Sequence, residues 1–198
     1  MHIKELEYHT PVSLAEACSL LSSGGPGAKV FAGGTDILPD LKRNRINAGS
    51  LICLAGLEEL KKIEKRGAAL WIGPLVSPDT LDRSALVRKI FPGLAEAAAS
   101  MAANQVRGMA TIGGNMCSAV PSADLPPSLL TAEAELVLTS GAGERRLALK
   151  DFFIGPRKTA LRPDEILAGI LIPELPGGTG TAYDKFQARD ASALAIVG

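Results

Sequence analysis

Over the first part of the chain, short hydrophobic runs typical of strands alternate with segments that carry helix-capping residues and helical spacing of apolar positions. Ser13-Leu-Ala-Glu16 forms a capping box, which predicts a helix running to about Leu21. Cys18 falls on the apolar face of this helix, so we expect a packed core thiol. The pattern predicts three further elements: a strand over 29–32, a helix capped by Thr35 that reaches about Arg45, and a strand over 50–54. Strand–helix–strand order of this kind favours a small parallel sheet.

After Gly56 the pattern becomes a mixture of strands and helices. Ser77 followed by Pro78 predicts a helix that ends near Phe91. Gly141-Ala-Gly143 marks the turn of a hairpin over 135–149. The other predicted elements are an alanine-rich helix over 92–103 and strands over 61–65, 70–73, 166–172 and 182–188. The predicted fold class is therefore α+β.

Composition and charge narrow the function classes. Lys and Arg total 21 and Asp and Glu total 21, so nothing favours binding to nucleic acid or an anionic membrane. The charged start is no secretory signal, and no apolar run approaches the roughly 20 residues that cross a bilayer, so we expect no transmembrane segment and a cytoplasmic protein.

The residues also give little support to metal or nucleophilic chemistry. Three widely spaced cysteines and two histidines, His2 and His9, form no pattern of metal or iron–sulfur ligands. A G-x-S-x-G elbow is absent, and neither histidine lies in a setting that suits a catalytic triad. A bound organic cofactor needs no catalytic side chain from the protein, so these absences fit a chain that carries such a cofactor.

Two glycine-rich segments, Phe31–Asp36 and Thr111–Asn115, are the candidate ligand sites. Because glycine has no Cβ, its backbone N–H can approach a phosphate closely, and a helix beginning after the first segment would add partial positive charge. A Gly-Gly turn before a helix is also an ordinary connection, and neither segment is the G-x-G-x-x-G fingerprint. The surrounding stretch 104–127 shows little periodicity and is too apolar for disorder, so we predict a binding loop there.

An ordered set of motifs resembles a known family. Val30-Phe-Ala-Gly-Gly-Thr-Asp-Ile37, Thr111-Ile-Gly-Gly-Asn115 and Pro121-Ser-Ala-Asp124 resemble the FAD-binding subunits of molybdenum hydroxylases, such as xanthine dehydrogenase, aerobic carbon monoxide dehydrogenase and 4-hydroxybenzoyl-CoA reductase. Further matches in the family's order are Gln105-Val-Arg107, Leu149-Lys-Asp-Phe-Phe153 with Gly155, and Asp164-Glu-Ile-Leu167 with Ile172-Pro173. The likeness covers nearly the whole chain, and the ordered set is more specific than either glycine segment alone.

The resemblance implies the two-lobed FAD-binding fold shared with vanillyl-alcohol-oxidase-type flavoproteins. Residues 1–57 would form a small α/β lobe, and residues 58–198 a larger α+β lobe with an antiparallel sheet and flanking helices. FAD would lie extended between the lobes, held non-covalently, with its diphosphate against the backbones of Gly33 and Gly113. On this interpretation Gly33→Val or Gly113→Val would abolish FAD binding in a chain that still folds.

The resemblance also implies a set of cofactor contacts and no catalytic side chain. Met101 and Leu167 suit the core equally well, and Lys185 suits a solvated strand. The implied contacts are Val30, Phe31, Ala32, Gly33, Gly34, Thr35, Asp36, Ile37, Met101, Thr111, Ile112, Gly113, Gly114, Asn115, Asp124, Leu167 and Lys185.

By the same resemblance the chain would relay electrons inside a larger oxidoreductase. A molybdopterin subunit would carry the molybdenum cofactor, an iron–sulfur subunit would carry [2Fe-2S] clusters, and FAD would exchange electrons with NAD, oxygen or a quinone. Relatives normally continue past Gly198 into a third domain, so we expect the usual C-terminal domain to be absent. Two alternatives stay open: a flavin-free scaffold or interaction subunit, and a fragment of a self-contained FAD oxidase.

Overall fold

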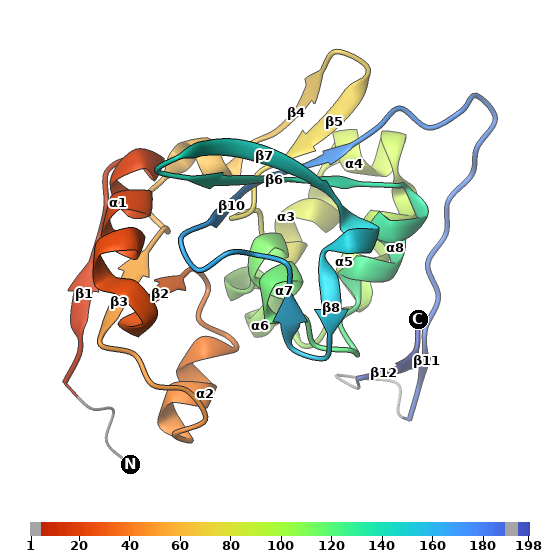
Figure 1. Cartoon of the computed structure of the whole chain (residues 1–198). Helices are drawn as coiled ribbons and strands as arrows, with labels where there is room; N and C mark the ends of the chain where they lie inside the picture. Colours follow the sequence, from red (N-terminus) through yellow and green to blue (C-terminus); the bar gives the residue numbers. More distant parts are fainter. Residues whose placement is uncertain (1–4, 189–193) are drawn as a thin grey trace.

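Two main sheets organise the described part of the fold, and most helices pack against the larger one. The computed structural model describes residues 5–188 and 194–198. In Figure 1 a three-stranded sheet with helix α1 lies at the left, and a five-stranded sheet crosses the top above a group of helices. The smaller sheet is parallel and the larger is antiparallel, which agrees with the predicted α+β class.

The parallel sheet has the strand order β1-β3-β2 and carries α1 (Leu14–Gly24). The Ser13 hydroxyl accepts the Glu16 N–H at 3.1 Å and the Glu16 carboxylate accepts the Val12 N–H at 2.8 Å, so both capping side chains are in use. Cys18 is buried, as predicted. The strands are β1 (Glu7–His9), β2 (Ala28–Phe31) and β3 (Ser50–Cys53), and a 3₁₀ turn over Gly25–Gly27 follows α1.

The antiparallel sheet has the order β4-β5-β10-β6-β7. The predicted hairpin is present, with Ser140 paired to Gly143 at the end next to its turn. In β10 the register shifts between Leu167 and Gly169, and a Cβ on Gly169 would lie 1.9 Å from a ring carbon of Trp71, so only glycine fits beneath that indole. The strands are β4 (Ile63–Arg66), β5 (Ala69–Ile72), β6 (Glu135–Ser140), β7 (Gly143–Ala148) and β10 (Ile166–Ile172).

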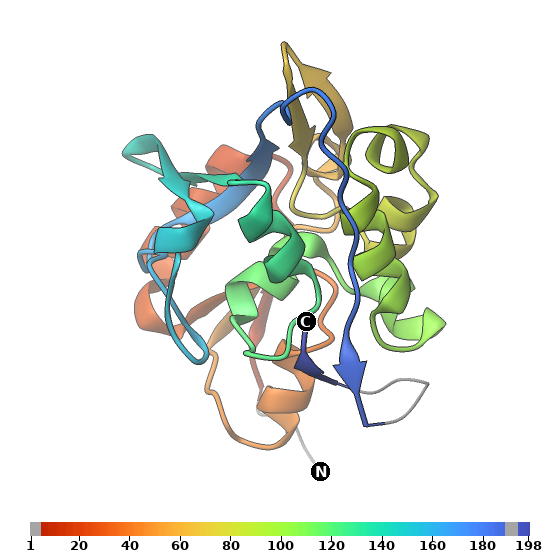
Figure 2. The same ribbon diagram turned by 90° about the vertical axis from the view of Figure 1, so that its right-hand side faces the viewer.

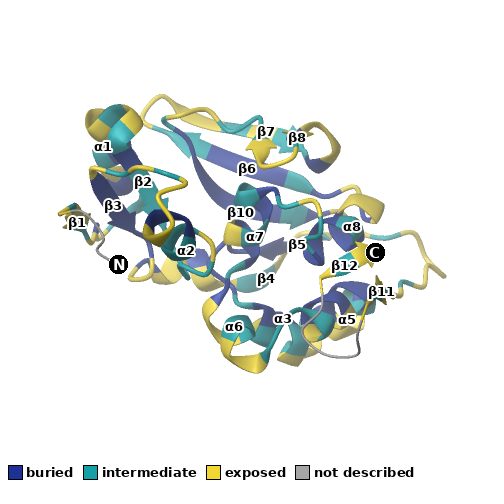
Figure 3. Cartoon of the chain, turned by 90° about the horizontal axis from the view of Figure 1, so that it is seen from below, coloured by how far each residue is buried: buried dark blue, intermediate teal, exposed yellow. Residues whose placement is uncertain are grey.

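Helices beneath this sheet enclose the main core. Phe91, Leu94, Met116 and Phe152 are fully or almost fully buried against strand residues such as Ile170. Seen from below, buried positions follow β6 and helices α5 and α8, while exposed positions lie at the rim (Figure 3). The helices are α3 (Pro78–Arg83), α4 (Ala85–Ile90), α5 (Pro92–Ser100), α6 (Asn104–Met109), α7 (Ile112–Ser118) and α8 (Leu125–Thr131), with 3₁₀ turns at Glu58–Lys61 and Leu149–Asp151.

Several element predictions were wrong in extent. The helix expected over 78–91 breaks at Ser84, whose hydroxyl accepts the Val87 N–H and so starts a new helix. The stretch 104–127 is not a loop: it contains α6, α7 and the start of α8, each too short to show a helical period. Helix α2 (Ile37–Lys42) begins later and ends earlier than predicted, and Thr35 does not cap it.

The last part of the chain runs back along the outside of the helices. Figure 2 shows this segment descending the molecule to the short pair β11 (Phe186–Gln187) and β12 (Ala195–Val197). Along the way the Gly93 N–H donates to the Thr181 hydroxyl at 3.0 Å, and the Tyr183 N–H donates to the Glu96 carboxylate at 2.8 Å. Only the last residues of the strand predicted over 182–188 are extended and paired. None of the helices among the described residues is long and apolar enough to span a membrane.

Candidate functional site

The two glycine-rich segments line one cavity of about 560 Å³, although they lie far apart in the sequence. One wall is the β2–α2 connection, and the facing wall is α7 with its N-cap Thr111. The floor and far end come from Pro74 and Leu75, from the start of β10 and from Arg157 in the turn of the β8–β9 hairpin (Phe153–Gly155 and Lys158–Thr159). The predicted contacts that line this cleft are Val30, Ala32, Gly33, Gly34, Thr35, Asp36, Ile37, Thr111, Gly113, Gly114 and Leu167.

The first segment offers unpaired backbone donors. Among the described residues, the N–H groups of Gly33, Gly34, Thr35 and Asp36 donate to no protein atom. Such a run of neighbouring N–H groups can bind an anion. Gly34 has φ +75°, a conformation that favours glycine. These donors agree with the expectation that this segment can approach a phosphate.

Gly33 also has a packing role, which the motifs did not indicate. A Cβ on Gly33 would lie 1.8 Å from the Met109 carbonyl oxygen and 3.2 Å from the Cα of Ala110. The missing side chain therefore makes room for the α6–α7 connection. Gly33→Val would disturb this packing, so we expect that variant to lose stability as well as FAD affinity.

The second segment uses its own backbone donors within the protein. The Gly113 N–H donates to the Pro74 carbonyl at 2.8 Å, the Ile112 N–H to the Val76 carbonyl at 2.9 Å and the Gly114 N–H to the Thr111 hydroxyl at 3.0 Å. A Cβ on Gly113 would meet Pro74 at 2.6 Å, so this glycine too has a packing role, and we expect Gly113→Val to lose stability.

The polar side chain of this second segment has an oxygen that no protein donor uses. The Asn115 Oδ1 is buried without a hydrogen-bond partner among the described residues. A buried amide left in this way is costly unless something bonds it. Asn115 itself is not among the residues that line the cleft; neither is Ile112, which is fully buried in the core, nor Phe31, whose ring packs edge-to-face on Tyr8 at 6.2 Å.

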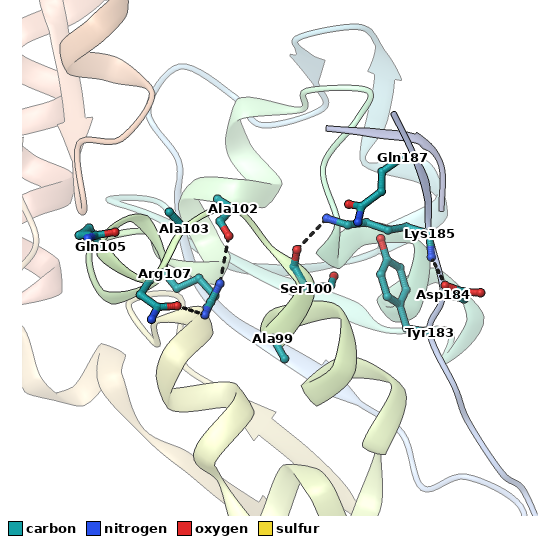
Figure 4. Close-up of a pocket in the computed structure, with 11 residues that line it drawn as sticks. Ala99, Ser100, Ala102, Ala103, Gln105, Arg107, Tyr183, Asp184, Lys185 and Gln187 are labelled. Atoms are coloured by element: carbon teal, nitrogen blue, oxygen red, sulfur yellow. Dashed lines mark hydrogen bonds between the residues drawn. The ribbon is translucent and has the colours of Figure 1, made fainter. Parts of the chain in front are cut away.

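Three predicted contacts lie apart from this cleft. Asp124 is buried, and its Oδ1 accepts the Lys185 ammonium at 3.1 Å and the Tyr183 hydroxyl at 3.2 Å. Lys185 also donates to the Ser100 carbonyl at 2.7 Å (Figure 4). Burial, together with the Asp124 charge, raises the pKa of Tyr183. Met101 follows Ser100 and packs against the main core.

This cluster borders a second cavity of about 630 Å³ between the α5–α6 connection and the last segment of the chain. Figure 4 shows Ser100, Tyr183 and Lys185 gathered on one side of it, with Arg107 on the other. Arg107 donates to the Met101 and Ala102 carbonyls at 2.9 and 3.0 Å, so it fixes the turn that forms this side.

Charged residues outside the predicted set of cofactor contacts complete the first cleft. Glu165 is buried and accepts a two-pronged contact from Arg145, at 2.6 and 2.9 Å. The Arg145 guanidinium holds the pKa of Glu165 below its usual range. This pair anchors the chain just before Leu167. Across the cleft Arg157 donates to the Asp40 carboxylate at 3.0 Å.

The described residues contain no cluster of three or more His, Cys, Asp or Glu that could hold a metal ion. The family model "FAD binding domain in molybdopterin dehydrogenase" matches residues 4–175. The carbon monoxide dehydrogenase medium chain of Hydrogenophaga pseudoflava is 36% identical over 183 residues, covering 92% of this chain and 64% of the relative. The xanthine dehydrogenase FAD-binding subunit of Escherichia coli O157:H7 is 34% identical over 193 residues, covering 96% and 66%.

Solved structures give the same result. A carbon monoxide dehydrogenase from Hydrogenophaga pseudoflava superposes with a TM-score of 0.94 at 35% identity, over 98% of this chain and 68% of that one. Quinoline 2-oxidoreductase from Pseudomonas putida 86 gives a TM-score of 0.92 at 28% identity, over 98% and 67%. The chain thus spans about two thirds of the length of these relatives, and the family expected from the motifs is confirmed. This chain belongs to the family of FAD-binding domains of molybdopterin dehydrogenases.

Proposed function

We propose that this chain binds FAD non-covalently in the cleft between its glycine segments and serves as the electron-transfer domain of a molybdenum hydroxylase complex. The observation that carries the proposal is that both family motifs line one cavity of about 560 Å³. That volume is within the usual range for cofactor sites. The bound flavin would supply one- and two-electron exchange, so the protein needs to hold and orient it.

The residues of the cleft fit a dinucleotide. Unpaired N–H groups from Gly33 to Asp36 suit the diphosphate. Next to the cleft-lining Gly114, the unpartnered Oδ1 of Asn115 could accept a further hydrogen bond if its side chain turned toward the ligand. Apolar liners such as Leu75 and Leu167 suit a ring system. In this arrangement the first segment binds the anion, while the second positions α7 and closes the opposite wall.

We further propose that FAD extends toward the buried Asp124–Lys185 pair. The buried charges of Asp124 and Lys185 lie 3.1 Å apart and can orient a polar ligand group. On this basis residues 1–57 form the small lobe and residues 58–198 the larger lobe, with the cofactor between them.

The wider role rests on the relatives. The matching relatives are named as subunits of carbon monoxide dehydrogenase and xanthine dehydrogenase. We propose that this chain relays electrons between an iron–sulfur subunit and an external acceptor such as NAD, oxygen or a quinone. The molybdenum cofactor and the [2Fe-2S] clusters would then lie on partner subunits. A cytoplasmic location stays a prediction.

A titration with FAD, FMN and riboflavin tests the cofactor proposal. We expect the flavin fluorescence of FAD to be quenched on binding. FAD should also bind much more tightly than FMN or riboflavin, because only FAD among these three has the full diphosphate. ADP should compete with FAD. Failure of all four ligands to bind would contradict the proposal and favour a flavin-free scaffold.

A further inference from the structure

Arg157 occupies an unusual place at the rim of the cleft. It lies in the turn of the β8–β9 hairpin with φ +56°, a conformation that costs a non-glycine residue free energy. Its backbone N–H donates to the Ala119 carbonyl at the end of α7, at 2.8 Å. The hairpin is therefore tied to the helix that carries the second glycine segment, and the turn keeps a strained arginine at this point.

The side chain of Arg157 reaches the opposite wall. Its Nη1 donates to the Oδ2 of Asp40 at 3.0 Å, and both residues line the cleft. Among the described residues this is the one side-chain hydrogen bond between α2 and the β8–β9 hairpin. Asp40 is buried, whereas about half of the Arg157 side chain is exposed. The ion pair therefore holds the guanidinium at a fixed place in the cleft.

The Arg157 guanidinium has N–H donors that form no hydrogen bond to the described protein. In the described structure its Nε and Nη2 donate to no protein atom. The cleft is otherwise rich in carboxylates, since Asp36, Asp40 and Glu165 all line it, and Glu165 already has Arg145 as its partner. A ligand with two negative charges would meet repulsion there unless a cation faced it. Lys29 is the other cationic liner, but only a guanidinium offers a planar fork that matches phosphate oxygens.

We propose that Arg157, positioned by Asp40, binds a phosphate of the dinucleotide in this cleft. The inference deepens the proposed function and rests on it, because it names the residue that recognises the anionic part of FAD. Asp40 acts through Arg157: it holds the guanidinium across the cleft before the ligand arrives, so less side-chain entropy is lost on binding.

A simpler role for Arg157 is to neutralise buried Asp40 and nothing more. The two roles separate in a double-variant test. If Arg157 only neutralises Asp40, then Asp40→Asn removes the need for it, and adding Arg157→Gln costs no further FAD affinity. If Arg157 binds phosphate, Arg157→Gln weakens FAD binding in the wild-type and in the Asp40→Asn background alike.

The test measures dissociation constants of FAD, ADP and riboflavin for these variants, with thermal unfolding to verify that each is folded. Arg45→Gln is the matched control, because Arg45 contacts the same carboxylate at 3.4 Å but does not line the cleft. We expect Arg157→Gln to weaken FAD and ADP by roughly 10- to 100-fold and riboflavin by less than twofold, as for the loss of one charged hydrogen bond.

Four results would overturn the inference. The first is no further loss of FAD affinity when Arg157→Gln is added to Asp40→Asn. Equal loss for FAD and riboflavin would indicate general damage to the cleft, and unchanged FAD and ADP affinities would leave Arg157 no role in binding. A wild-type protein that binds neither FAD nor ADP would overturn the proposed function as well. Binding by the wild type with no effect of Arg157→Gln overturns this inference alone.

Discussion

Gly33→Ala tests whether the first glycine segment is held by packing or by the ligand. In the structure the added Cβ would lie 1.8 Å from the Met109 carbonyl oxygen. Close carbon–oxygen contacts are normally about 3.3 Å, so the β2–α2 connection and the α6–α7 connection would have to separate by roughly 1.5 Å. The three nearest atoms to that Cβ all belong to backbone, so no flexible side chain can turn away.

Overpacking of this kind costs about 1–3 kcal/mol. For a chain of this size that corresponds to a fall in Tm of roughly 2–12 °C. Because the same shift opens the cleft, FAD affinity should fall together with stability. Thermal unfolding and urea titration of the apo-protein measure the first effect, and flavin fluorescence measures the second.

Gly108→Ala is the matched control on the neighbouring helix α6. A Cβ there meets nothing within 4 Å, so this variant should be neutral or stabilised by up to about 1 kcal/mol. If Gly33→Ala left the apo-protein as stable as the wild type, the packing account of Gly33 would be refuted. If it also abolished FAD binding, the original interpretation of a glycine facing the diphosphate would hold.

Three further predictions concern buried groups. Glu165→Gln should destabilise the chain by about 3 kcal/mol at pH 7, because it leaves Arg145 without its buried counter-charge. Arg145 lowers the pKa of Glu165 in the folded chain, so the ion pair contributes its full stabilisation above the unfolded-state pKa of about 4.3. That stabilisation is lost as the pH falls through the lower folded-state pKa. Urea titrations should therefore show the unfolding free energies of the variant and the wild type converging in acid. Lys185→Met should lower Tm and weaken FAD binding by leaving Asp124 buried without its cation, and Asp124→Asn in the same chain should restore part of the lost Tm. Burial raises the pKa of the Cys117 thiol to about 12, so iodoacetamide at pH 8 should modify it slowly in the folded chain. Because Cys117 lines the cleft, bound FAD should slow the modification further. Labelling at the rate of the unfolded chain, measured by mass spectrometry, would contradict this.

Local chemistry made much of the fold predictable. The capping box at Ser13 needs only residues within one helical turn, and the hairpin at Gly141 needs only its turn and two alternating strands. The family followed from motifs in a fixed order, which does not depend on knowing any contact between them. The same order also indicated which segments gather at the cleft.

What escaped prediction depends on contacts between distant segments. The neighbour of Gly33 is Met109, and that of Gly113 is Pro74, so the sequence could not distinguish glycines that face a ligand from glycines that face backbone. Short helices such as α6 and α7 are stabilised by packing and caps, and neither is long enough to show a period. The Arg157–Asp40 pair escaped for the same reason, because its two residues meet only in the folded chain.

The most direct test of the central claim is the visible absorption spectrum of the purified protein after saturation with FAD and removal of excess ligand. We predict flavin bands that stay with the protein on gel filtration, at close to one flavin per chain, and that denaturation releases as intact FAD. A chain that shows a cooperative thermal unfolding transition, and is therefore folded, but is colourless after saturation and gel filtration would contradict the claim that this domain binds FAD.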